Sequence, residues 1–220
     1  RVRALAGSSQ AARVASRNDF PAATGLASSA SAFAALTLAA TRAAGLSLDQ
    51  AGLSRLARLG SGSACRSVPA GFVLWEMEEA HQVAPPEHWD LCDAIAIVTG
   101  QAKAVSSDDG HVLAPTSPLH AARLAAVPGW LAAVSDGLAR RDLAAMGPAI
   151  EADALAMHGV MMTSHPSLLY WLPATVAVLQ AVRAWRDGGL EVYFTIDAGP
   201  NVHCLCRAST ASEVEKRLKT

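Results

Sequence analysis

The chain has 220 residues, of which 51% are hydrophobic and 17% are charged, and its formal net charge is −1. This composition is typical of a well-packed globular protein and excludes intrinsic disorder, and the near-neutral charge gives no basic field to recruit nucleic acid. We find no apolar run long enough for a membrane span and no signal peptide. We therefore predict no membrane association and a cytoplasmic location.

The spacing of apolar residues and the helix-cap signals predict a mixture of helices and strands along the chain. Helices are expected over residues 30–45, 47–59, 118–143, 146–162, 174–186 and 213–219. Strands are expected over residues 70–76, 91–98, 190–196 and 202–206. Ser47 is the expected cap of the second helix, and Pro128 is expected to break the third.

The remaining segments are predicted to be irregular. The acidic stretch 76–89 contains Pro85-Pro86 and is predicted to be a surface loop. Residues 105–111 and 116–118 are rich in Ser, Thr and Asp and are predicted to be turns. We place the domain change so that residues 1–95 form one domain and residues 96–220 another.

The most informative stretch is residues 16–36, SRNDFPAATGLASSASAFAAL. A small-residue loop containing Gly25 leads into an Ala-rich segment, and Ser28 or Ser29 is a suitable helix cap. The unpaired N–H groups and the dipole of a helix N-terminus favour an anion such as phosphate. The same features are common in proteins that bind no phosphate, and the string is neither a Walker loop nor a dinucleotide-binding fingerprint.

Two further segments carry polar or charged side chains in turns. Residues 60–67, GSGSACRS, combine two glycines and three serines with Arg66, whose guanidinium can bind a carboxylate or phosphate through two hydrogen bonds. Residues 197–201, DAGPN, separate the last two predicted strands. Either segment alone could be an ordinary turn.

Taken together, these three segments resemble the diphosphomevalonate decarboxylase family, a branch of the GHMP kinase superfamily, in order and in spacing. The resemblance runs from near Arg13 to about Cys206. It implies an α+β GHMP kinase fold with a ribosomal S5 domain 2-like nucleotide-binding half and a ferredoxin-like C-terminal half. It also implies that roughly the first third of the family's length, with its substrate-binding lysine motif, would precede Arg1 in a longer chain.

The resemblance implies ATP-dependent decarboxylation of mevalonate 5-diphosphate to isopentenyl diphosphate, through phosphorylation of the 3-hydroxyl, in isoprenoid biosynthesis. ATP and Mg²⁺ are the implied cofactors, and the frequent dimers of the family make a homodimer a possible assembly. Asp197 matches the catalytic aspartate, and Arg66 would hold the substrate carboxylate. The positions matching nucleotide contacts are Ser16, Gly25, Leu26, Ala27, Ser28 and Ser29, and those matching substrate contacts are Ser61, Ser63, Arg66 and Ser107.

One position departs from the family pattern. Some members carry Arg where this chain has Asp108, and a carboxylate at that place would repel a diphosphate. This departure favours a substrate with one phosphate fewer, and three alternatives stay open in all. They are a phosphomevalonate decarboxylase that acts on mevalonate 5-monophosphate to give isopentenyl phosphate, a GHMP small-molecule kinase, and a non-catalytic paralogue.

Cysteine and histidine give weaker signals. Cys204 and Cys206 share one face of a predicted strand beside His203, but the spacing of metal ligands is lacking, so we predict no metal site. The four cysteines are expected to be small buried groups in a reducing compartment. His158 lies among apolar positions of a helix, where a lone histidine is more often a core residue than a catalyst.

Overall fold

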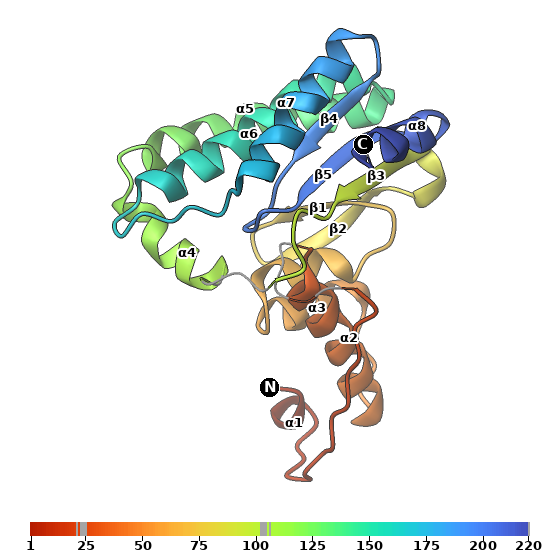
Figure 1. Cartoon of the computed structure of the whole chain (residues 1–220). Coiled ribbons are helices and arrows are strands. Elements are labelled where there is room, and N and C mark those ends of the chain that lie inside the picture. Colours follow the sequence, from red (N-terminus) through yellow and green to blue (C-terminus); the bar gives the residue numbers. More distant parts are fainter. Residues whose placement is uncertain (21, 23–25, 102–104, 106, 220) are drawn as a thin grey trace. The chain divides into compact units, whose positions relative to one another are not determined.

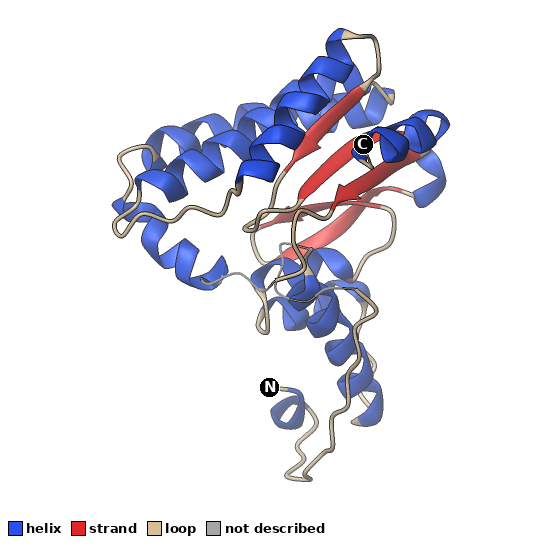
Figure 2. Ribbon diagram, viewed as in Figure 1, coloured by secondary structure: helices blue, strands red, loops and turns tan. Residues whose placement is uncertain are grey.

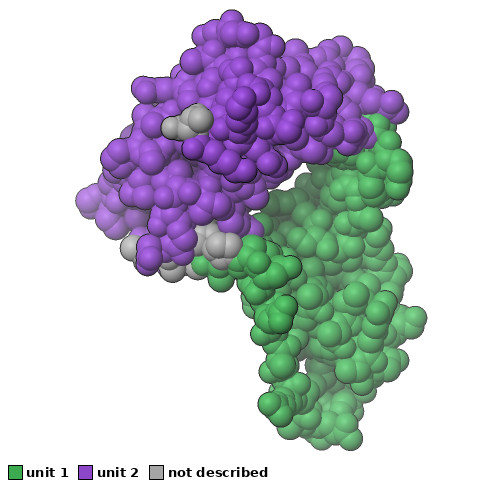
Figure 3. Space-filling view, turned by 45° about the vertical axis from the view of Figure 1, so that its right-hand side comes forward, with its two compact units in different colours: residues 1–22, 27–88 green, residues 23–26, 89–220 purple. Residues whose placement is uncertain are grey.

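The computed structural model describes residues 1–20, 22, 26–101, 105 and 107–219. Contacts within the chain divide it into two compact units (Figure 3). Unit 1 comprises residues 1–22 and 27–88, and unit 2 comprises residues 23–26 and 89–220. Among the residues described, no helix combines the length and the apolar character needed to cross a bilayer.

Unit 1 is built from short helices and one β-hairpin (Figures 1 and 2). Its elements are α1 (Val2–Leu5), α2 (Ser28–Ala43), α3 (Gln50–Arg58), the 3₁₀ helix η1 (Gly62–Ser67), β1 (Phe72–Glu76), β2 (Glu79–Ala84) and the 3₁₀ helix η2 (Pro86–His88). The helices α2 and α3 and the strand β1 agree with the prediction to within a few residues.

The surface loop predicted for residues 76–89 is wrong, because β2 occupies its middle. β1 and β2 pair antiparallel with Glu76 opposite Glu79, and Met77 adopts a φ of 52°, as a two-residue hairpin turn requires. Most side chains of β2 are exposed or only partly buried. A strand of such a ribbon needs few apolar residues, and its sequence therefore shows little alternation.

Polar side chains cap and connect elements of unit 1. The side chain of Asp49, and not that of Ser47, caps α3 by accepting a hydrogen bond from Gly52 N at 2.8 Å. Ser54 is buried within α3, where its Oγ donates to the carbonyl of Cys65 at 3.0 Å and accepts from Ala80 N at 2.9 Å. One hydroxyl group thus connects α3 with both η1 and β2.

Unit 2 is a three-stranded sheet with helices packed against it (Figures 1 and 2). Its elements are β3 (Leu91–Ala96), α4 (Ser107–Leu113), the 3₁₀ helix η3 (Ala114–Thr116), α5 (His120–Arg140), α6 (Leu143–Thr163), α7 (Pro173–Asp187), β4 (Val192–Thr195), β5 (Val202–Arg207) and α8 (Ala208–Leu218). The strands are antiparallel in the order β3-β5-β4. β3 pairs with β5 along its whole length, so it belongs to unit 2 and starts a few residues before the predicted domain change.

Two local predictions in unit 2 are wrong. α5 continues through Pro128, whose exposed position lets water reach the carbonyl that loses its hydrogen bond. The turn predicted for residues 105–111 largely gives way to α4. Leu113, at the end of α4, packs on a buried cluster that includes Val160 and Met161 of α6, and this burial favours a helix over the local preference of Ser and Asp for turns.

The main core of unit 2 lies between the sheet and the helices α7 and α8. Leu179 and Val182 of α7 and Val214 of α8 meet apolar side chains of the strands there. The buried strand residues of this cluster are Ala94, Val192, Phe194, Val202, Cys204 and Cys206. Tyr193 follows Val192 in β4, and its ring leaves no room for a side chain at Gly147 of α6. The helix α6 therefore packs closely against this strand.

A partly buried ion pair lines the free edge of β4. The guanidinium of Arg186 in α7 contacts both carboxylate oxygens of Glu151 in α6, at 2.7 and 3.1 Å. Arg186 also donates to the carbonyl of Val192 at 2.9 Å, and Glu151 accepts from Phe194 N at 3.2 Å. The pair satisfies backbone groups that a second neighbouring strand of β4 would otherwise satisfy.

Replacing Glu151 by Ala should lower the free energy of unfolding by about 1–3 kcal/mol, because the partly buried guanidinium of Arg186 would lose its carboxylate and the buried amide of Phe194 would lose its acceptor. Urea unfolding monitored by tryptophan fluorescence measures this change. Glu213→Ala is the matched control, since Glu213 pairs with Arg217 on the surface of α8 and should have little effect. Equal losses in the two variants would contradict the role given to the pair of Glu151 and Arg186.

Candidate functional site

The loop before α2 ends in an unusual backbone conformation. Ala27 precedes the helix with φ 53° and ψ 30°, the left-handed region, which costs a residue with a side chain roughly 1–2 kcal/mol. α2 begins at Ser28, close to the predicted start, but its N-cap is Ala27, so neither Ser28 nor Ser29 is the cap residue. Ala27 itself thus offers no side-chain acceptor to the N-terminus of this helix of 16 residues, where the dipole favours an anion.

The structure brings two of the predicted segments of unit 1 together. Ser29, in the first turn of α2, has its Oγ 3.3 Å from Oγ of Ser61, which directly precedes η1. Gly60 makes this approach possible, because a side chain at its position would overlap the ring of Phe33 in α2. One predicted nucleotide-binding residue, Ser29, and one predicted substrate-binding residue, Ser61, thus lie side by side in unit 1.

Arg66 is held by an aromatic side chain that no sequence motif singled out. Its guanidinium carbon lies 5.4 Å from the ring centre of Trp75 in β1, a distance at which a cation and a π-face attract each other. Arg58 lies 5.8 Å from the same ring and pairs with Glu78 at 2.7 Å. Arg66 is exposed, so its donors can reach a carboxylate from solution.

Asp197 lies in unit 2, just beyond the end of β4, and its side chain is exposed. The turn that carries it is fixed by Asn201, which is fully buried. Oδ1 of Asn201 accepts from Val98 N at 2.8 Å and from Thr99 N at 3.1 Å, and Nδ2 donates to the carbonyl of Thr99 at 3.2 Å. The turn is thereby joined to the chain that leaves β3.

A second contact holds the same turn from α7. Thr175 is fully buried, and its Oγ1 donates to the carbonyl of Pro200 at 2.7 Å while accepting from Leu172 N at 3.1 Å. The backbone around Asp197 is therefore fixed from two sides. Asn201 belongs to a motif that the sequence revealed, but the part played by Thr175 depends on a contact between residues 25 positions apart, which has no local signal.

The other predicted residues are placed as follows. Ser16 is exposed in an irregular segment of unit 1, and Ser63 is partly buried in η1. Leu26 belongs to unit 2, Ser107 begins α4, and Gly25 lies outside the described residues. Among the predicted site residues, the structure places Ser29 and Ser61 of unit 1 within contact of each other.

The cysteines and His203 form ordinary core and surface contacts. Burial, together with the nearby carboxylate of Asp93, raises the pKa of Cys204 to about 12, and all four cysteines are free thiols. Nδ1 of His203 lies 2.7 Å from the carboxylate of Asp93. Within the described ranges, no three His, Cys, Asp or Glu side chains gather as a metal site.

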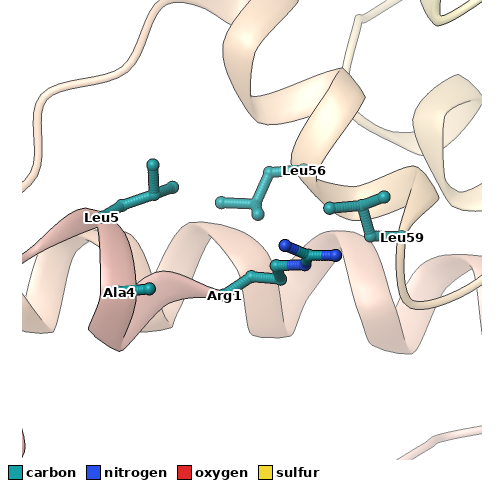
Figure 4. A pocket seen from close by; sticks show the side chains of 5 residues that line it. All are labelled: Arg1, Ala4, Leu5, Leu56 and Leu59. Atoms are coloured by element: carbon teal, nitrogen blue, oxygen red, sulfur yellow. The ribbon is translucent and has the colours of Figure 1, made fainter.

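A pocket of about 380 Å³ lies between α1 and α3 of unit 1 (Figure 4). Its lining is mostly apolar and consists of Arg1, Ala4, Leu5, Leu56 and Leu59. None of the predicted site residues lines it, so we do not assign it to the site.

Comparison with known proteins decides the family. Residues 1–84 match the family model described as diphosphomevalonate decarboxylase-like N-terminal domain, and residues 94–220 match the one described as mevalonate 5-diphosphate decarboxylase C-terminal domain. The chain belongs to the diphosphomevalonate decarboxylase family. The family predicted from the three motif segments is thus confirmed.

The relatives include decarboxylases of two kinds. The diphosphomevalonate decarboxylase of Ganoderma lucidum is 38% identical over 211 residues, which are 88% of this chain and 53% of that protein. The phosphomevalonate decarboxylase of Haloferax volcanii is 33% identical over 220 residues, which are 98% of this chain and 68% of that protein. The chain spans about half the length of most curated relatives that it matches.

Solved structures of the family share the fold. Mevalonate diphosphate decarboxylase from Staphylococcus aureus superposes with a TM-score of 0.93 at 34% identity, over 99% of this chain and 68% of that one. The mevalonate diphosphate decarboxylase from Enterococcus faecalis superposes with a TM-score of 0.90 at 36% identity, over 99% of this chain and 68% of that one. A structure described as MDDEF in complex with MVAPP, AMPPCP and magnesium superposes with a TM-score of 0.92 at 37% identity, over 99% of this chain and 69% of that one. The predicted α+β GHMP kinase fold is thereby confirmed.

Replacing Gly60 by Ala should destabilise unit 1 by about 1–3 kcal/mol and separate Ser29 from Ser61, because the added methyl group would displace the ring of Phe33. Gly62→Ala is the control, since a methyl group there would lie 3.7 Å from Trp75, an ordinary contact. Thermal unfolding of the two variants measures the difference. Equal melting temperatures would show that close packing at Gly60 is not required.

Proposed function

We propose that this protein, as a member of the diphosphomevalonate decarboxylase family, catalyses the ATP-dependent decarboxylation of mevalonate 5-diphosphate to isopentenyl diphosphate. The observation that carries the proposal is the fixed turn beyond β4, which presents the exposed carboxylate of Asp197. We also propose, from the family resemblance, a cytoplasmic location and a homodimeric assembly.

The residues before and at the start of α2 fit a nucleotide triphosphate. The backbone N–H groups at the N-terminus of α2, where Ala27 stands in the cap position, and the hydroxyl groups of Ser28 and Ser29 are donors of the kind that phosphate oxygens require. Ser16, Gly25, Leu26 and Ala27 would complete the loop. When bound, ATP supplies the phosphoryl group that turns the tertiary 3-hydroxyl into a leaving group. We propose that Mg²⁺ accompanies it, coordinated mainly by phosphate oxygens and water.

Asp197 would act on the 3-hydroxyl of the substrate. A tertiary hydroxyl is a poor nucleophile, and a carboxylate that accepts its proton or its hydrogen bond raises its reactivity. The rigid turn serves this role because a general base must stay within hydrogen-bonding distance of the proton that it accepts. The side chain of Asp197 is also open to solvent, to which the proton can afterwards be released.

Arg66 would bind the substrate carboxylate. Two parallel hydrogen bonds from a guanidinium fix a carboxylate in one orientation, and the ring of Trp75 limits where the guanidinium can lie. The bond from the carboxylate carbon to its neighbour then breaks, CO₂ leaves, and the electron pair forms the double bond as the phosphate departs from the adjacent carbon. Ser61, Ser63 and Ser107 would contribute hydroxyl donors to the substrate.

A second candidate substrate is mevalonate 5-monophosphate, which would give isopentenyl phosphate. Two observations favour it. The Haloferax volcanii relative, named phosphomevalonate decarboxylase, is matched over 68% of its length, and Asp108 places a carboxylate in the segment where some family members carry Arg. A monophosphate carries less negative charge than a diphosphate and would be repelled less by this group.

Release of CO₂ from carboxyl-labelled substrate tests the function most simply. The protein in its full natural length is incubated with ATP and Mg²⁺ and with either the 5-diphosphate or the 5-monophosphate. We expect release from the diphosphate, a loss of about 10²–10⁴-fold in kcat for Asp197→Asn, and a loss of about 10–100-fold in kcat/KM for Arg66→Lys, which removes a charge-assisted hydrogen bond.

The other outcomes separate the alternatives. Release from the monophosphate alone would replace the first candidate by the second, and Asp108→Arg should then shift the preference towards the diphosphate. Formation of ADP without CO₂ would identify a small-molecule kinase. No turnover of either compound would contradict the proposed function and leave the fold unaffected.

A further inference from the structure

Two arginine side chains of unit 1 meet one aromatic ring. The guanidinium carbon of Arg66 in η1 lies 5.4 Å from the ring centre of Trp75 in β1, and that of Arg58 in α3 lies 5.8 Å from it. Both distances lie within the range at which a π-face attracts a cation. One ring of the β1–β2 hairpin (Figure 1) thus interacts with side chains of two other elements.

The two arginines differ in their other partners. Nη1 of Arg58 donates to a carboxylate oxygen of Glu78 at 2.7 Å, so this carboxylate takes up a donor of Arg58 and offsets its charge. Among the residues that the structure describes, no carboxylate pairs with Arg66, whose side chain is exposed. A π-face attracts a guanidinium through its quadrupole and needs none of its N–H donors. Trp75 can therefore hold Arg66 and leave its charge and its donors available to an anion.

The ring of Trp75 is itself held in place. Its Nε1 donates to the carbonyl of Met77 at 3.2 Å, in the turn of the hairpin, where Met77 has a φ of 52°. A methyl group at Gly62 would lie 3.7 Å from Cη2 of the same ring, so the benzene part of the ring reaches the first residue of η1. The hairpin turn and η1 thus both contact the ring, and η1 is the element that carries Arg66.

We propose that Trp75 is a positioning residue, which holds the guanidinium of Arg66 by its π-face in the orientation that binds the substrate carboxylate, and that the hairpin turn sets the ring through the carbonyl of Met77. The proposal rests on the proposed decarboxylase function and deepens it. An acidic side chain in the place of Trp75 would also order Arg66, but it would compete with the substrate carboxylate for the same donors. An aromatic ring orders the cation without this competition.

Three variants of the protein in its full natural length test this role. Trp75→Phe keeps a π-face and removes the hydrogen bond to Met77, whereas Trp75→Leu removes both. Trp185→Leu is the matched control. Trp185 of α7 lies 6.0 Å from the guanidinium carbon of Arg217, which pairs with Glu213 at 2.7 Å, and none of these three residues has a role in the proposed reaction.

We expect Trp75→Leu to lower kcat/KM for the phosphorylated mevalonate by about 3–30-fold, the loss of a cation–π contact, with the KM for ATP changed by less than about twofold. Trp75→Phe should lose less, because a phenyl face still attracts the guanidinium. Trp185→Leu should match the wild type in kcat/KM. An unchanged kcat/KM in Trp75→Leu, or equal losses in the Leu and Phe variants, would overturn the proposal.

A double-mutant cycle separates positioning from a general structural role. If Trp75 acts through Arg66, Trp75→Leu should change kcat/KM by less than about twofold when it is made in an Arg66→Gln background. A ring that only stabilised unit 1 would cost the same in both backgrounds. Additive losses would therefore overturn the proposal.

The NMR signal of the Arg66 Nε–H group gives a readout that does not depend on turnover. The signal is assigned by its absence in Arg66→Gln, and the ring current of Trp75 should displace it. We expect Trp75→Leu to move the signal and Trp185→Leu to leave it in place. If the wild type turned over neither substrate, the proposed function would fail. The signal would still decide whether Trp75 holds Arg66, and an unchanged position in Trp75→Leu would show that it does not.

Discussion

The carboxamide of Asn201 is the contact on which the arrangement of unit 2 around Asp197 depends. It is fully buried and bonds three backbone groups of Val98 and Thr99. An unpaired buried amide or carbonyl costs about 1–3 kcal/mol, so the turn cannot leave this position without leaving several such groups unsatisfied. From α7, the hydroxyl of Thr175 donates a further hydrogen bond to the carbonyl of Pro200. A flexible turn between two strands thus becomes a rigid support for one carboxylate.

Polar side chains that bond to backbone groups also fix other parts of the molecule. The pair of Glu151 and Arg186 completes the outer edge of β4, from which the turn emerges. In unit 1, Ser54 joins α3 to η1 and β2, and the contact of Phe33 with Gly60 sets the distance between α2 and the loop of Ser61. In both units, buried polar contacts and close packing position loops that carry exposed polar side chains, as rigid active sites require.

Local sequence patterns were sufficient for most elements and for the family. Alternation in residues 190–196 and 202–206 predicted β4 and β5, and the Pro-initiated pattern after residue 173 predicted α7. The failures share one cause. β2 is a mostly exposed strand with little apolar periodicity, α5 tolerates Pro128 because its surface is hydrated there, and α4 is stabilised by packing on α6. In each case, tertiary context decided the structure.

The candidate site divides in the same way. Asp197, Arg66 and the serines were predicted from motifs, because chemistry restricts which residue types can stand there. The roles of Trp75 and Thr175 could not be predicted, because each depends on residues of different elements meeting in the fold. Motifs show which side chains a reaction needs, whereas the fold shows what holds them in place.

We propose that a rigid turn, and not only the presence of a carboxylate, makes Asp197 effective. The most direct measurement is kcat for CO₂ release by Thr175→Val, which keeps the shape of the side chain and removes the bond to Pro200. Thr210→Val is its control, since it also loses a hydroxyl bond to a backbone carbonyl, at the start of α8. We expect a kcat at least about tenfold lower for Thr175→Val than for the wild type and Thr210→Val. Equal kcat values for all three proteins would contradict it.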